Sequence, residues 1–170
     1  LLSVLDMLCL VILIVIQTLA AMKMSVLNKL LEQRAYTDAH TGLPNKDACE
    51  VLLNNKETVA KHTACIMFDL NNLKIINDTK GHSKGDQLIL NFARLLRNVI
   101  PQKDFVGRYG GDEFMVVIYN TSKTEIEDIL KQLSREKDRL NSSGNNMPID
   151  YACGWAISDA DSECTIQMLL

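Results

Sequence analysis

The hydrophobic positions of the first 22 residues leave no polar face, and this separates the segment from the rest of the chain. No charged residue occurs from Met7 to Met22, and apolar side chains run unbroken from Leu10 to Ile16. At about 1.5 Å of rise per residue, a helix over residues 1–22 is roughly 33 Å long, which is enough to cross the hydrocarbon core of a bilayer. The pattern therefore predicts a transmembrane helix over residues 1–22.

The charges that follow this segment predict its orientation. Lys23, Lys29 and Arg34 come directly after it, and no Lys or Arg precedes it. Because basic residues are retained on the cytoplasmic side of a membrane, we expect the C-terminal side in the cytoplasm. A signal peptide fits less well, since a basic n-region and a small-residue cleavage site are both missing. A buried core helix so uniformly apolar would be unusual in so small a domain.

The remaining apolar positions follow helical and strand spacings in turn. Apolar residues three and four apart, with Gly and Pro as breaks, predict helices over 23–37, 45–55, 71–78, 86–99 and 124–140. Short apolar runs predict strands over 64–68, 105–106, 114–119 and 149–157, with a loop at 81–85. Because strands and helices alternate, we expect an α/β (α+β) fold in which helices cover a sheet.

The helix predicted over residues 23–37 is expected to be a signalling linker. Met24, Leu27 and Leu31 form one apolar stripe on it. This stripe fits a parallel partner helix but is too short to establish a coiled coil. The predicted organisation is therefore a transmembrane helix over 1–22, a helical linker over 23–37 and one domain over 38–170.

Composition and charge narrow the class of that domain. The chain carries 18 Lys and Arg against 21 Asp and Glu, a formal net charge of −3, and all but one of these charges follow Met22. This balance argues against a nucleic acid polymer as partner, because such polymers are bound by strongly basic faces. The 5 cysteines include no CxxC pair, and with the 3 histidines they form no metal-ligand pattern.

Carboxylates occur where a predicted strand and a predicted hairpin end. Asp69 follows an apolar run, and Asp112 and Glu113 follow Gly110 and Gly111 at the hairpin tip. Carboxylates at one sheet edge can share Mg²⁺, which prefers one or two carboxylates together with water and substrate phosphates. The two glycines lack a Cβ, so backbone N–H groups can approach a phosphate closely.

A second polar group surrounds the glycine-rich segment 81–85. Asn77 and Asp86 can bind a guanine edge, since Asp accepts from N1–H and the 2-amino group and Asn can donate. Lys74 lies one helical turn before Asn77 and offers a positive charge to phosphate. Each feature alone is typical of a cap or a turn, and no P-loop sequence is present. Together they favour a metal-dependent nucleotide site.

Three ordered motifs resemble the GGDEF family of diguanylate cyclases. Residues 108–114 read RYGGDEF, residues 68–86 read FDLNNLKIINDTKGHSKGD, and residues 38–46 read DAHTGLPNK. The last segment is similar to the family pattern DxLTGLxNR, with His40 in place of Leu and Lys46 in place of Arg. The resemblance covers residues 38–170, which are on this basis identified as a GGDEF domain.

The resemblance implies a fold, an activity and a set of site residues. The fold would be a central, mostly antiparallel sheet ringed by helices, similar to class III nucleotide cyclases and the polymerase palm. The activity would be condensation of two GTP molecules to cyclic di-GMP with release of two pyrophosphates, with Mg²⁺ or Mn²⁺ as cofactor. The residues carried over are Asp69, the Leu70 carbonyl and Asp112 as metal ligands, Asp112, Glu113 and Lys74 as catalytic residues, and Asn77, His82, Asp86, Gly110 and Gly111 as GTP-binding residues.

The implied chemistry needs two copies of the domain. Each domain binds one GTP, and the two ribose hydroxyls must attack each other's α-phosphates, with Asp112 as the candidate base. We therefore expect a homodimer in the cytoplasmic (inner) membrane, arranged by the span and the linker under an upstream sensor. The chain opens on Leu1 and stops at Leu170, before the family's final helix, so we expect a fragment truncated at both ends.

One regulatory feature of the family departs from its pattern here. The product-inhibition site usually begins with Arg in an RxxD sequence ahead of the signature strand. The corresponding residues run from Pro101 to Asp104, so the aspartate is retained and the arginine is replaced. Proline has no guanidinium to bind phosphate or guanine, and we expect this site to be absent.

Other functions remain open at this point. The chain could be a catalytically inactive GGDEF-like module that binds GTP or a protein partner and relays a signal. It could also be a plain membrane-anchored interaction domain, or a cyclase that makes a cyclic mononucleotide. The metal and guanine residues of the motifs are all present, and this favours an active diguanylate cyclase, a nucleotidyltransferase.

Overall fold

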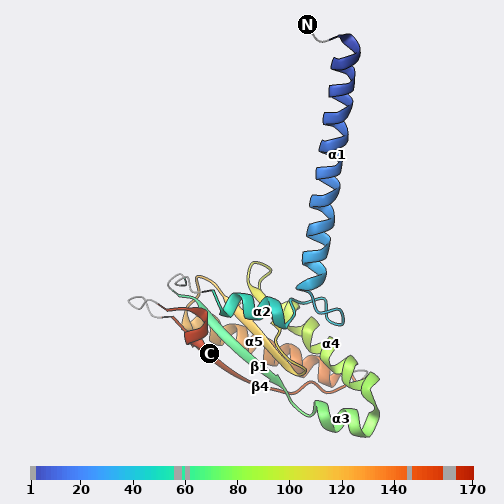
Figure 1. The fold of residues 1–170 in the computed structure, drawn as a ribbon. Helices are drawn as coiled ribbons and strands as arrows, with labels where there is room; N and C mark the ends of the chain where they lie inside the picture. Colours follow the sequence, from blue (N-terminus) through green and yellow to red (C-terminus); the bar gives the residue numbers. More distant parts are fainter. Residues whose placement is uncertain (1–2, 56–58, 60–61, 145–146, 159–163) are drawn as a thin grey trace. The chain divides into compact units, whose positions relative to one another are not determined.

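The computed structural model describes residues 3–55, 59, 62–144, 147–158 and 164–170, and it divides into two units after Ala35 (Figure 1). The first unit is the helix α1 (Val4–Ala35), which continues without a break through the predicted span and most of the predicted linker. Its segment Val4–Glu32 is long and apolar enough to cross a membrane, and none of the residues in its most apolar stretch is buried. The first two residues of the predicted span lie outside the described residues.

The second unit, Tyr36–Leu170, is built on an antiparallel sheet. Its described strands are β1 (Ala64–Leu70), β2 (Phe105–Arg108), β3 (Glu113–Ile118) and β4 (Tyr151–Ile157), in the order β2-β3-β1-β4. The inner strands are β3 and β1, and on β1 Ile66 pairs with Val116 of β3 and with Trp155 of β4. This sheet confirms the predicted fold class.

Helices cover this sheet, and their caps are encoded locally. They are α2 (Lys46–Leu53), α3 (Leu73–Lys80), α4 (His82–Val99), α5 (Lys123–Ser142) and the 3₁₀ helix η1 (Ile166–Leu169). Asn45 accepts the Ala48 N–H at 3.0 Å at the start of α2. Ser122 and Glu125 form a capping box at the start of α5, which satisfies two amides that have no partner within the helix.

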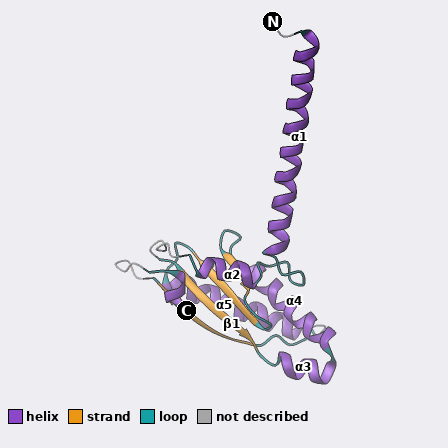
Figure 2. Cartoon of the chain, viewed as in Figure 1, coloured by secondary structure: helices purple, strands orange, loops and turns teal. Residues whose placement is uncertain are grey.

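The inner strands β1 and β3 are buried on both faces, and each face of the sheet has its own core. On β1, Ile66 and Phe68 belong to the cluster formed with α4 and α5, whereas Cys65 and Met67 belong to the cluster formed with α2 and η1. This follows from the two-residue period of a strand. Figure 2 shows the helices and strands of this unit by colour. Phe68 and Phe92 of the first core meet edge to face with ring centroids 5.9 Å apart, a contact worth about 1 kcal/mol beyond area burial.

The predicted loop at 81–85 is wrong. Only Gly81 interrupts the helices, with a left-handed φ of 85°, and α4 begins directly at His82. Gly85 is a buried residue of α4. A Cβ added at this position would overlap Oδ1 of Asn77 on α3. Glycine at this position therefore allows α3 and α4 to pack closely rather than forming a loop.

Candidate functional site

The predicted carboxylates lie together at one end of the β1–β3 ladder. Asp69 and Glu113 are direct partners in the antiparallel register, so their side chains lie on the same face of the sheet. Asp69 belongs to β1 itself, which extends to Leu70 and not only to residue 68 as predicted. The Leu70 N–H donates to the Asp112 carbonyl at 2.9 Å, which holds the hairpin tip beside the end of β1.

A hollow of about 240 Å³ opens next to these carboxylates. Besides Asp69 and Glu113, its lining includes Ala152 and Gly154 of β4, which is an edge strand among the described strands. Both residues are exposed, and no heavy atom lies within 4 Å of a Cβ added to Gly154. Small residues on β4 thus leave space beside the carboxylates. Sequence reasoning missed them because they carry no polar group, and only strand pairing places them there.

Arg108 holds the glycine hairpin in shape. Its Nε donates to the Gly110 carbonyl at 3.1 Å, and its Nη2 donates to the Gly111 carbonyl at 2.8 Å. The N–H groups of Tyr109 and Gly110 donate to the Glu113 carbonyl at 2.8 and 3.2 Å. The hairpin that carries Asp112 and Glu113 is therefore pre-organised by one guanidinium.

The same guanidinium binds Asp38. Nη1 of Arg108 lies 3.2 Å from Oδ2 of Asp38, and the two side chains are only 16% and 22% exposed. The Thr41 N–H and hydroxyl also donate to Asp38, at 2.8 and 2.6 Å. Partial burial alone would raise the pKa of Asp38, but the Thr41 hydrogen bonds and the Arg108 charge together lower it. No role was predicted for this pair, since nothing in the spacing of two distant motifs indicates their contact.

The segment from Asp38 to Asn45 also reaches α4. His40 Nε2 lies 2.9 Å from the carbonyl oxygen of Asp86, while the Arg108 N–H donates to the Pro44 carbonyl at 2.8 Å. This segment therefore connects the glycine hairpin on one side with the start of α4 on the other.

The predicted guanine residues lie on α3 and α4. Asn77 is half-buried, and its Oδ1 is buried with no hydrogen-bond partner among the described residues. Lys74 on α3 and His82 and Asp86 on α4 are exposed. Within the described part of the chain, no hydrogen bond or ion pair joins these four side chains to the carboxylates. The connection between the groups is short, since α3 begins at Leu73, soon after the end of β1.

The oxygen donors at the sheet edge fit a hard divalent cation. Two carboxylates, Asp69 and Asp112, and the Leu70 carbonyl are the ligand types that Mg²⁺ and Mn²⁺ prefer. Among the described residues, no group of three or more His, Cys, Asp or Glu side chains could hold a metal. Mg²⁺ is usually bound by one or two carboxylates together with substrate phosphates, so this donor set suits an ion that arrives with a nucleotide.

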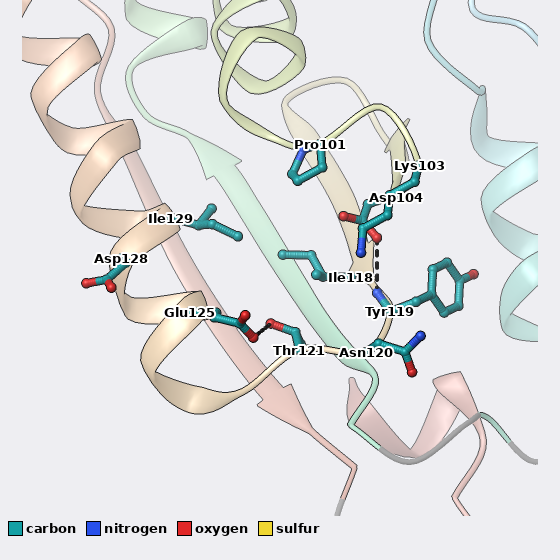
Figure 3. Close-up of a pocket in the computed structure, with 10 residues that line it drawn as sticks. All are labelled: Pro101, Lys103, Asp104, Ile118, Tyr119, Asn120, Thr121, Glu125, Asp128 and Ile129. Carbon is teal, nitrogen blue, oxygen red and sulfur yellow. Dashed lines mark hydrogen bonds between the residues drawn. The ribbon is translucent and has the colours of Figure 1, made fainter.

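The segment from Pro101 to Asp104, where we expect no product-inhibition site, is packed into the domain. Asp104 is 4% exposed and accepts the Tyr119 N–H at 3.1 Å through Oδ1 (Figure 3). Pro101 and Asp104 border a second hollow of about 240 Å³, whose lining also includes Glu125 and Asp128. Burial and the negative charge of Asp104 raise the pKa of Tyr119. Acidic side chains outnumber the single Lys of this lining, which disfavours an anionic ligand.

Fold and site together define a class: an antiparallel sheet covered by helices, with carboxylates at a strand end beside a glycine hairpin. The chain belongs to the GGDEF family, because residues 35–170 match the family described as "Diguanylate cyclase, GGDEF domain". The predicted family is thereby confirmed.

Known proteins match the chain over more than half of its length. It is 33% identical over 113 residues to the diguanylate cyclase DgcP of Escherichia coli, covering 64% of this chain and 33% of that protein. It is 35% identical over 103 residues to the cyclic di-GMP phosphodiesterase PdeB of Shewanella oneidensis, covering 61% of this chain and 12% of that protein. The chain thus spans a third or less of these two relatives.

A solved structure shows the same fold. The coiled coil and GGDEF domain of DgcB from Caulobacter crescentus, in complex with c-di-GMP, superimposes with a TM-score of 0.75. The match covers 91% of this chain and 85% of that one, at 22% sequence identity.

Proposed function

We propose that this chain is the membrane-anchored cyclase portion of a diguanylate cyclase. It condenses two GTP to cyclic di-GMP as a homodimer with one GTP per subunit. Each 3′-oxygen forms a bond to the other nucleotide's α-phosphorus, the bond to the β-phosphate breaks, and two pyrophosphates and two protons leave. The observation that carries the proposal is the register that places Asp69 opposite Glu113, with Asp112 held beside Leu70.

The carboxylates provide the metal and proton chemistry of this proposal. Asp69, the Leu70 carbonyl and Asp112 would hold Mg²⁺ or Mn²⁺, which supplies Lewis-acid stabilisation when bound. Asp112 takes the proton of the attacking 3′-hydroxyl, and Glu113, which pairs with Asp69 across the ladder, would support the bound ion. The hollow bordered by Ala152 and Gly154 leaves room for phosphates beside these groups.

The remaining predicted residues bind the nucleotide. The Gly111 N–H and the Lys74 ammonium bind phosphate oxygens, whereas the Gly110 N–H already donates to the Glu113 carbonyl and Gly110 contributes a backbone without a Cβ beside the phosphate. Asn77, His82 and Asp86 bind the guanine nucleotide at the start of α4. Asn77 would donate to the base through its amide nitrogen, because its Oδ1 is buried and packs against Gly85.

The proposed location follows from α1 and from the substrate. A helix of the length and composition of Val4–Glu32 spans the cytoplasmic (inner) membrane, and the basic residues after residue 22 keep the GGDEF domain in the cytoplasm, where GTP is available. Residues 23–37 then form the helical linker that sets the geometry of two domains.

The proposal is tested by incubating the chain in detergent with GTP and Mg²⁺ and separating the nucleotides by chromatography. Cyclic di-GMP supports the cyclase. GTP that binds without turnover favours the alternative, a catalytically inactive GGDEF-like module that binds GTP or a protein partner and relays a signal. One relative supports considering this alternative. The segment that resembles this chain belongs there to a protein that is named a phosphodiesterase and not a cyclase.

One GTP per subunit predicts that the rate of cyclic di-GMP formation depends on dimerisation of the chain. Because each subunit supplies one GTP, the specific activity should rise with enzyme concentration until the chain is fully dimeric. The measurement is initial rate per subunit over a dilution series, with the oligomeric state followed by light scattering. A specific activity that stays constant down to fully monomeric chain would contradict the homodimer.

The loss of the arginine at Pro101 predicts weak or absent product inhibition. Adding cyclic di-GMP to the assay should leave the initial rate nearly unchanged, since the stretch offers no guanidinium and its hollow is mainly acidic. Asp104→Asn should lower stability, because the Tyr119 N–H loses a charged acceptor, without changing the response to product. Tight cyclic di-GMP binding that Asp104→Ala abolishes would overturn this prediction.

A further inference from the structure

The imidazole of His40 is held at the start of α4 in a defined hydrogen-bonding state. Its Nε2 lies 2.9 Å from the carbonyl oxygen of Asp86, and the residue is exposed. A carbonyl can only accept, so Nε2 carries the hydrogen and donates it. In the neutral ring, Nδ1 is then an acceptor. No other hydrogen bond of this ring occurs within the described residues.

Two further polar groups lie at the first turns of α4. The Asn77 side chain packs against Gly85, because a Cβ added to Gly85 would overlap Oδ1 of Asn77. Gly85 directly precedes Asp86, whose carbonyl binds His40. The His40 imidazole, the Asn77 amide and Asp86 therefore surround the first turns of α4, although they come from three separate segments of the chain.

We propose that His40 is a specificity-determining residue for guanine, with Nδ1 accepting a hydrogen bond from the exocyclic 2-amino group. This rests on the proposed function, in which Asn77 and Asp86 bind the base. The Asp86 carboxylate takes N1–H and one hydrogen of the 2-amino group. The second hydrogen needs another acceptor, which Nδ1 provides and which the leucine of the family pattern does not offer.

Two nucleotides that differ in one group, GTP and inosine triphosphate, test this role of His40. Inosine triphosphate keeps N1–H and O6 of GTP and lacks only the 2-amino group. His40→Leu should therefore raise the KM for GTP by about three- to tenfold, the range of one neutral hydrogen bond, with kcat nearly unchanged. The KM for inosine triphosphate should not move, so the preference for GTP falls by the same factor. His40→Gln keeps one donor and one acceptor and should restore part of the preference.

A matched control is available at the other exposed histidine outside the site. His62 has a left-handed φ of 64°, and its carbonyl accepts the Thr121 N–H at 2.8 Å. His62→Asn keeps this backbone bond, and Asn tolerates the left-handed conformation. It should leave both KM values at the wild-type level.

The readouts are turnover of each nucleotide and its equilibrium dissociation constant, for the whole chain in detergent. If the wild type makes cyclic di-GMP and His40→Leu keeps the full preference for GTP, the inference is wrong and the proposed function stands. If the wild type makes no product, the proposed function fails, and the ratio of the two dissociation constants decides the inference. A ratio that falls in His40→Leu supports it, whereas an unchanged ratio, or no binding of either nucleotide, overturns it.

Discussion

Asp112→Ala should lower the rate of cyclic di-GMP formation by about a thousandfold or more, because it removes both a metal ligand and the candidate base. The fold should survive, since the contact that holds this residue beside β1 comes from its main-chain carbonyl, which accepts the Leu70 N–H. The measurement is chromatographic product formation with Mg²⁺ at saturating GTP. Asp112→Asn keeps the size of the side chain and should be equally inactive, which assigns the loss to the charge.

Asp47→Ala is the matched control for this prediction. Asp47 is an exposed carboxylate in the first turn of α2. It belongs neither to the carboxylates at the end of the β1–β3 ladder nor to the proposed guanine-binding residues. Its loss should change the rate less than twofold. A rate for Asp112→Ala within about tenfold of the wild type would remove Asp112 from the proposed chemistry, since a metal ligand contributes several kcal/mol.

Arg108→Ala should destabilise the domain by about 2–3 kcal/mol and abolish activity as well. The change leaves the Asp38 carboxylate without its guanidinium partner and frees the Gly110 and Gly111 carbonyls. The free energy of unfolding is measured in urea by the fluorescence of Trp155, the single tryptophan, which lies in β4 and packs against the core. Arg108→Lys should recover little, because one ammonium does not reproduce the planar fork.

The comparison for Arg108 is an ion pair of similar length on the surface. Arg139 lies 2.8 Å from Glu136, with side chains 70% and 38% exposed, so Arg139→Ala should cost less than about 1 kcal/mol.

The cost of Arg108→Ala should also depend on pH. Because the folded-state pKa of Asp38 is lowered, its contribution is present above the ordinary Asp pKa and lost as pH falls through the folded value. The difference from wild type should therefore narrow below about pH 4. A cost for Arg108→Ala no larger than that of Arg139→Ala would show that the hairpin does not need this guanidinium.

Much of the fold could be predicted because it is encoded locally. The continuous apolar run of β1, the Asn45 cap and the amphipathic pattern of α4 each depend on neighbours within a few residues. The same locality explains the error at residues 81–85. The glycines there predict a loop by their local preference, whereas Gly85 lies within α4 and packs against the side chain of Asn77 on another helix.

The sequence by itself determined the family, the antiparallel sheet class and the chemical types available at the site, because motifs and periodicity are properties of contiguous residues. Only the tertiary structure decided which groups meet. The Arg108–Asp38 pair, the contact of His40 with Asp86, and the hollow beside Ala152 and Gly154 each join segments far apart in the chain. Such contacts depend on strand register and helix packing, which sequence spacing does not specify when the partners are separated by whole elements.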